Sequence, residues 1–343
     1  MVHHRAVRML CLARAALLGL VAALVFMTRP AMVHADDLPP VQVVASFSVL
    51  GDMVKEIGGR HVQVESIVGP NADAHSFEPT PQAVQALANA QVLVSNGLGF
   101  EAWLPRLIKS SGFSGEHIVV SNGASLRTLS DDGGHGHGAH DHDAKTDIDS
   151  ADQDPHAHEH GDVDPHAWQN LKNGMIYADN IADGLSMADP SRASHYQRRV
   201  KKYLSTMQKL DAEVRTALAA IPAERRTAVT AHDAFGYFGD EYGIEFIPLA
   251  GLANSAEPTA KDIAALIDRL RDETHIGIFP EKVSNPKMIE QLAREANIVV
   301  GGHLYSDALD NADEPAGTYL GMFHWNAGQL ISVLKSDQPR ASD

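Results

Sequence analysis

The residues best suited to chemistry in this chain are histidines and one acid placed beside predicted strands and helices. Five of them follow a strand or precede a helix: His75, His166, His232, His303 and Asp307. In parallel α/β sheets, ligands bind at the carboxyl ends of the strands, so these side chains can converge on one cleft. Three neutral imidazoles and one carboxylate suit a tetrahedral Zn²⁺ site, whereas oxygen-rich sites suit manganese better.

A histidine-rich run from His135 to Trp168 offers a competing set of metal ligands. It holds eight histidines, and eleven acids accompany one lysine between Asp131 and Asp164. A segment with almost no aliphatic side chains cannot bury enough surface to order itself, so we predict a loop over residues 131–163. The run contains "DPHAH" as well as "DPHAW". Only the second precedes a helical apolar pattern, which favours its histidine, His166, as the residue of the cleft.

The elements that must position these residues alternate between strand and helix. Before the histidine-rich run, β-rich stretches are separated by helical ones, one of which starts with Thr80 as a cap and Pro81 at its first position. The second half repeats this order, with predicted strands in "RTAVTAH", "IEFIPLAGL" and "IGIFPEKV", and a last strand that ends at Val300 and continues into a loop in "NIVVGGHLYSDAL". This β-α-β-α order predicts parallel sheets covered by helices.

A long helix is predicted between the two sets of strands. From Pro190 onward, apolar residues recur at three- or four-residue steps: Tyr196, Val200, Leu204, Met207, Leu210, Val214, Leu218 and Ile221. Some 30 helical residues would reach roughly 45 Å, enough to connect two lobes. We therefore predict an α/β fold of two lobes, each a small parallel sheet flanked by helices. The predicted bounds are 36–188 for the first lobe, 189–221 for the connecting helix and 222–343 for the second lobe.

The first residues have the layout of a secretory signal peptide. Three arginines precede a thirteen-residue apolar core, Ala15–Met27, and Val33 and Ala35 are the small residues before a cleavage site. We predict a signal peptide over residues 1–35 and a mature protein in the periplasm, without stable insertion in a membrane. The only cysteine, Cys11, lies in this segment, so any metal must be held by His, Asp or Glu. The net charge of −16 argues against nucleic acid as a partner.

Four ordered motifs carry a resemblance to a known family: "GPNADAHSFEPTPQ", "DVDPHAWQN", "TAHDAFGYFGDEYGI" and "LYSDAL". They resemble the landmarks of the metal-specific solute-binding proteins of ABC importers, in the zinc-binding, ZnuA-like branch. The resemblance covers nearly the whole mature chain. It implies a cluster A-I type fold with a metal ion buried between two lobes.

The resemblance also implies the ligands of that ion, which are His75, His166, His232 and Asp307. In manganese-type relatives the third position is usually Glu, so His232 favours Zn²⁺ as the transported ligand, with manganese or mixed specificity as the alternative. The alternatives to Asp307 as the fourth ligand are Glu78, Glu257 and water. Glu281 supports a ligand or forms a surface ion pair, and the sequence does not decide between them.

The other histidines of the run are predicted to be an accessory, low-affinity metal site, because closely spaced imidazoles can share a cation loosely. They are His135, His137, His140, His142, His156, His158 and His160. The resemblance implies that the loop with these histidines collects zinc at low affinity or senses how abundant it is.

The expected function is capture and delivery rather than catalysis. The expected partners are an ABC transporter permease and, through it, an ATPase, with a periplasmic zinc chaperone as a further candidate, and the protein is expected to be a monomer. The rival class is a secreted zinc hydrolase, but the sequence contains no catalytic pattern such as HExxH.

Overall fold

The computed structural model describes residues 38–128, 163–251, 260–271 and 276–335. The predicted signal peptide and nearly all of the predicted histidine-rich loop lie outside these ranges. The chain divides into two units, Met1–Pro39 and Pro40–Asp343, and every element below belongs to the second. No helix within the described ranges is long and apolar enough to cross a membrane.

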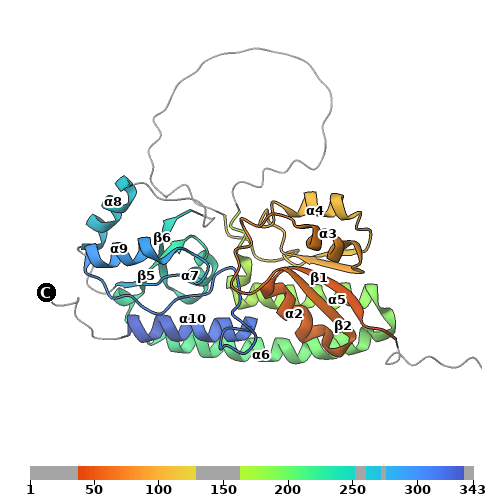
Figure 1. Ribbon diagram of the computed structural model, residues 1–343. Coiled ribbons are helices and arrows are strands. Elements are labelled where there is room, and N and C mark those ends of the chain that lie inside the picture. The colour runs from red at the N-terminus through yellow and green to blue at the C-terminus, as the bar shows by residue number, and fades with distance from the viewer. Residues whose placement is uncertain (1–37, 129–162, 252–259, 272–275, 336–343) are drawn as a thin grey trace, which may run out of the picture. The chain divides into compact units, whose positions relative to one another are not determined.

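The first sheet has four parallel strands in the order β2-β1-β3-β4. The strands are β1 (Val41–Phe47), β2 (Val62–Val68), β3 (Val92–Ser95) and β4 (Glu116–Val119). Helices α2 (Ser48–Gly58) and α5 (Leu171–Ala188) contact these strands on one side, while α3 (Pro81–Ala88) and α4 (Leu104–Ser111) lie on the other (Figure 1). Thr80 caps α3 as predicted, because its hydroxyl accepts a hydrogen bond from the Ala83 amide at 3.2 Å.

The second sheet has three parallel strands in the order β6-β5-β7. They are β5 (Thr227–His232), β6 (Glu245–Ala250) and β7 (Ile276–Ile278), accompanied by helices α7 (Gly236–Tyr242), α8 (Ala260–Arg271), α9 (Pro286–Ala296) and α10 (Tyr319–Leu334). The predicted fourth strand is wrong as a regular strand. Its residues form only the isolated bridges Ile278–Val300 and Glu281–Leu304, which extend the sheet toward Asp307.

Helix α6 (Ala193–Ala219) is the predicted connecting helix, preceded by a short 3₁₀ turn at Pro190–Arg192. It contacts α2 and α5 of the first half and α7 and α10 of the second, so it runs along both (Figure 1). Its buried face follows the predicted spacing with one difference: Tyr203 is buried, while Leu204 is only partly so. At ~1.5 Å per residue, this helix is about 40 Å long.

Two hydrophobic cores hold these elements. The larger contains the first sheet, α5 and α6, and continues into α7 and α10 of the second half. The smaller lies between the second sheet and helices α8 and α9, and includes Val229, Ile267 and Leu292. The fold is therefore α/β with two parallel sheets flanked by helices and joined by one long helix. Both sheets direct strand ends toward the candidate residues.

Candidate metal centre

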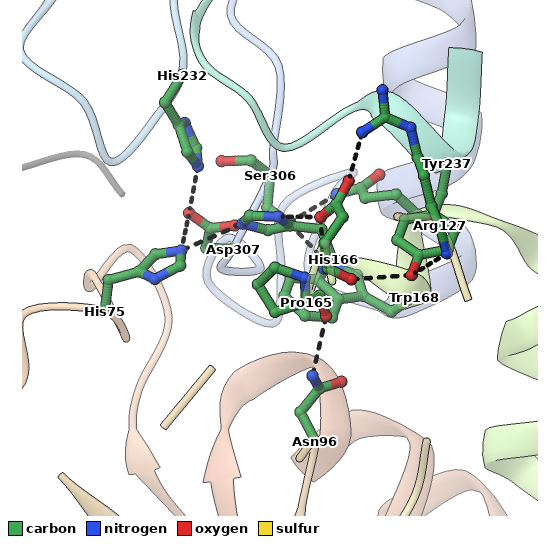
Figure 2. Close-up of polar contacts among 12 residues, drawn as sticks. His75, Asn96, Arg127, Pro165, His166, Trp168, His232, Tyr237, Ser306 and Asp307 are labelled. Carbon is green, nitrogen blue, oxygen red and sulfur yellow. Dashed lines mark hydrogen bonds and ion pairs between the residues drawn. The ribbon is translucent and has the colours of Figure 1, made fainter. Parts of the chain in front are cut away.

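Four side chains from four separate segments meet in one cluster, called here the donor cluster: His75, His166, His232 and Asp307 (Figure 2). Their potential ligand atoms all lie within 4.8 Å of one another. His75 is in the loop between β2 and α3, His166 directly precedes a 3₁₀ turn before α5, His232 ends β5, and Asp307 lies between β7 and α10. These four residues are the ligands that the family resemblance implies, and the fold brings all four together.

Four distances between donor atoms are close to those that one small ion requires. Tetrahedral bonds of about 2.1 Å place neighbouring ligand atoms about 3.4 Å apart. His75 Nε2 lies 3.2 Å from His166 Nε2 and 3.7 Å from Asp307 Oδ2. Asp307 Oδ2 lies 3.1 Å from His232 Nε2, and Asp307 Oδ1 lies 3.5 Å from His166 Nε2. The cluster therefore fits a divalent cation with three nitrogen donors and one carboxylate.

The ring of His166 is oriented by Asp164. Asp164 Oδ1 lies 2.8 Å from His166 Nδ1 and also accepts the His166 backbone N–H at 3.0 Å. A proton on Nδ1 leaves the lone pair of Nε2 directed at the cluster, as metal-binding histidines require. The other carboxylate oxygen accepts a hydrogen bond from Arg127 Nη1 at 3.2 Å. Tyr237 donates its hydroxyl to the Asp164 carbonyl at 2.8 Å, so both ends of this residue are held (Figure 2).

The ring of His232 is paired with the carboxylate of Glu281, which answers the question that the sequence left open. Glu281 is buried, and its Oε2 lies 2.7 Å from His232 Nδ1. Its Oε1 accepts the backbone N–H groups of Ala231 and His232 at 2.8 and 3.0 Å. Glu281 therefore supports a candidate ligand and is not part of a surface ion pair.

His75 is held by its loop and by an aromatic ring. Asp73 Oδ1 accepts the His75 backbone N–H at 2.8 Å, and Trp103 donates its indole N–H to the Ala74 carbonyl at 2.8 Å. The imidazole lies edge-on to Phe100, with ring centroids 4.6 Å apart. In the part of the chain that the structure describes, no carboxylate is hydrogen-bonded to Nδ1 of this ring. The His75 side chain is 11% exposed, whereas those of the other three members are fully buried.

Burial and charge set different protonation states for these groups. Burial lowers the pKa of His75, and the nearby Asp307 does not outweigh it. Burial also acts to lower the pKa of His232, but the Glu281 and Asp307 carboxylates outweigh it and hold this pKa well above the usual value. Burial acts to raise the pKa of Asp307, and the adjacent His232 outweighs it, so Asp307 is ionised. Without metal, His232 and Asp307 thus form an ion pair.

Other residues considered in the sequence lie elsewhere. Glu78 is exposed and outside the donor cluster, and Glu257 lies outside the described residues. His303 is hydrogen-bonded to the Tyr305 hydroxyl at 3.0 Å and is likewise not in the cluster. The seven loop histidines fall in the range 129–162, which the structure does not describe.

Only some of the aromatic residues close to the donors in sequence lie beside them in the fold. Phe235 and Phe238 pack on Phe246 in the core. Trp168, two residues after His166, contacts the ring of His166, whereas the ring that contacts His75 is that of the more distant Phe100. Sequence reasoning missed Phe100 and the orienting role of Asp164. The second had a signal, since Asp164 stands two residues before His166 in "DPHAW".

Known proteins similar to this chain are named for the metals that they bind or transport. The iron ABC transporter substrate-binding lipoprotein MtsA of Streptococcus pyogenes is 28% identical over 300 residues, 86% of this chain and 89% of that protein. The manganese ABC transporter substrate-binding lipoprotein PsaA of Streptococcus pneumoniae is 27% identical over 300 residues, which are 86% of this chain and 89% of that protein. Among solved structures, the periplasmic zinc binding protein TroA of Treponema pallidum matches with a TM-score of 0.74 and 29% identity, over 87% of this chain and 99% of that one.

The family comparison covers most of the chain. The family described as zinc-uptake complex component A, periplasmic, abbreviated ZnuA, matches residues 43–333. This range contains both sheets, the long helix and all four members of the donor cluster. The chain therefore belongs to the ZnuA family and is a metal-binding solute-binding protein of an ABC importer.

Proposed function

We propose that this protein captures Zn²⁺ in the periplasm and delivers it to the permease of an ABC importer, whose ATPase drives uptake. The observation that supports this best is the spacing of the donor cluster, where the donor pairs given above lie 3.1 to 3.7 Å apart. That range brackets the edge of about 3.4 Å expected for tetrahedral zinc. A fourth protein donor, Asp307, takes the position that a catalytic zinc leaves to water, which favours a carrier over a hydrolase.

The donor chemistry supports zinc among the divalent ions. Three of the four donors are imidazole nitrogens, and nitrogen donors favour Zn²⁺ over Mn²⁺ in the general order of affinities. Two of the three imidazoles have a carboxylate on Nδ1, which strengthens the donor at Nε2.

Manganese is the second candidate, and one observation favours it. The two oxygens of Asp307 face different histidines, with Oδ1 toward His166 and Oδ2 toward His75 and His232. If both oxygens bound the ion, the site would offer five donors, and higher coordination by oxygen suits manganese. PsaA, named for manganese, and TroA, named for zinc, are both similar to this chain.

Calorimetric titration of the metal-free mature protein with Zn²⁺ and Mn²⁺ separates these candidates. We expect one tight site that prefers Zn²⁺, with Mn²⁺ displaced in competition. Equal or tighter Mn²⁺ binding would overturn the zinc assignment but not the capture of metal. The absence of any tight divalent site would overturn the proposed function.

The accessory role of the loop can be tested in the same titration. Thr128 and Val163 form an antiparallel bridge, so the two ends of the loop are adjacent, and deletion of residues 131–161 leaves three residues to join them. We expect the tight site to survive and weaker sites to disappear. Loss of the tight site with the loop would mean that the loop histidines are the main ligands.

Cleavage of the predicted signal peptide is tested by mass spectrometry of the exported protein, whose mass should be that of a chain without residues 1–35.

A further inference from the structure

A second contact joins the same two loops that carry His75 and Asp307. Asn71 lies four residues before His75, and Asp310 lies three residues after Asp307. The Asn71 side-chain amide donates a hydrogen bond to Asp310 Oδ1 at 3.0 Å, and its backbone N–H donates to the Leu309 carbonyl at 2.9 Å. Neither Asn71 nor Asp310 belongs to the donor cluster. The two loops are thus joined once through the candidate ligands and once beside them.

The backbone of Asn71 and the charge of Asp310 both favour this hydrogen bond. Asn71 has φ 56°, a left-handed conformation that asparagine tolerates better than most residues. Asp310 is 7% exposed and also accepts a hydrogen bond from the Tyr305 hydroxyl. Burial acts to raise the pKa of Asp310, but the hydrogen bonds from Tyr305 and Asn71 outweigh it and lower the pKa to about 2. The carboxylate is therefore charged, and a hydrogen bond to a charged acceptor is stronger than a neutral one.

We propose that the hydrogen bond between Asn71 and Asp310 is a clasp that holds the two loops together and sets how fast the bound cation leaves. This inference rests on the proposed capture of a divalent cation by the donor cluster. His75 is the most exposed donor, and no carboxylate among the described residues is hydrogen-bonded to its ring, so its position depends on where its loop is held. Asn71 and Asp310 are positioning residues, because they act on the cation only through His75 and Asp307.

The clasp is tested by the rate at which Zn²⁺ leaves the loaded protein when excess EDTA is added. Asn71→Gly keeps the left-handed backbone and the amide bond to Leu309, and removes only the side chain. We expect release to accelerate about tenfold, since hydrogen bonds to charged groups contribute this much. Asn71→Asp places two carboxylates together, and its release should be faster still. Combining it with Asp310→Asn exchanges donor and acceptor across the same gap, and release should slow again.

A matched control separates positioning from general destabilisation. Asn180→Ala also removes an asparagine amide, which donates to the Val120 and Asn122 carbonyls at 2.8 Å, remote in sequence from both loops. Its melting temperature without metal should fall while its release rate stays at the wild-type value. Unchanged release in Asn71→Gly, or no slowing in the double variant, would overturn the clasp alone. If wild-type protein held no divalent cation tightly, the proposed function would fall first.

Discussion

The end of β5 and the loop after β2 each supply an imidazole to the donor cluster, but they hold it differently. His232 is the last residue of a strand, is fully buried, and has the Glu281 carboxylate 2.7 Å from Nδ1. His75 is in a loop, is 11% exposed, and rests on the ring of Phe100. The His232 ring is therefore held by a buried charge, and the His75 ring is held by packing at a partly exposed position.

This difference separates two tasks that a carrier must perform. A ligand held by a buried carboxylate is preorganised, so little is lost in ordering it when the ion binds. A partly exposed ligand on a loop is the one that can move without disturbing a sheet. We therefore expect changes to the charged supports to reduce affinity strongly, and changes around His75 to act more weakly and mainly on release.

The largest loss of Zn²⁺ affinity is expected from a change at Asp307, which lies close to both His75 and His232. Its oxygens lie 3.1 to 3.7 Å from the Nε2 atoms of all three histidines. Since losing a residue that merely supports a ligand costs about 10–100-fold in affinity, Asp307→Asn should cost more than a hundredfold. Isothermal titration with Zn²⁺ measures it. Asp313→Asn, an exposed acid between Asp307 and α10, is the control and should bind as wild type does.

The second largest loss of Zn²⁺ affinity is expected from a change at Glu281, whose carboxylate is paired with the ring of His232. Glu281→Gln keeps the size of the side chain but removes the charge that holds the ring, so we expect Zn²⁺ affinity to fall about 10–100-fold. The matched control is Glu245→Gln, because Glu245 is exposed and forms a surface ion pair with Arg269 at 3.0 Å. If both variants bound zinc equally, the buried carboxylate would have no part in binding.

The pH dependence of metal affinity should reflect the difference between His232 and His75. In the metal-free protein the pKa of His232 is raised and that of His75 is lowered, so His232, unlike His75, must lose a proton at neutral pH to bind metal. Below the pKa of His232, affinity should rise about tenfold per pH unit, and above it the rise should stop. Titrations in buffers of different ionisation enthalpy count the released proton. Glu281→Gln should move the levelling-off to lower pH, and an unchanged profile would contradict the assignment to His232.

Much of the fold could be predicted because its signals are local. The strand Val41–Phe47, the cap Thr80 and the face of α6 all follow from period and capping, and the structure has them. The last predicted strand was wrong, since a strand depends on a partner that the sequence does not show; only two bridges form there. Helix α10 was not predicted, although Met322, Phe323, Asn326, Ala327 and Leu330 follow helical spacing.

The donor cluster could be anticipated from motifs, but its supports could not. His75, His166, His232 and Asp307 stand in recognisable stretches of sequence, whereas Glu281 is 49 residues from the histidine it orients. Asn71 and Asp310 are 239 residues apart. Contacts of this kind depend on how loops from two sheets meet, which periodicity and composition do not encode.

The smallest effect is expected at Phe100, whose ring lies edge-on to His75 at 4.6 Å between centroids. An aromatic pair contributes about 0.5–1.5 kcal/mol, so Phe100→Leu should raise the Zn²⁺ release rate only about two- to tenfold. Phe235→Leu is the control, because Phe235 is equally buried but stacks on Phe246 in the core. Both variants should lose similar stability without metal, and only Phe100→Leu should release zinc faster. If Phe100→Leu instead matched Glu281→Gln in its loss of affinity, packing would hold His75 as firmly as charge holds His232, and the contrast between the two regions would fail.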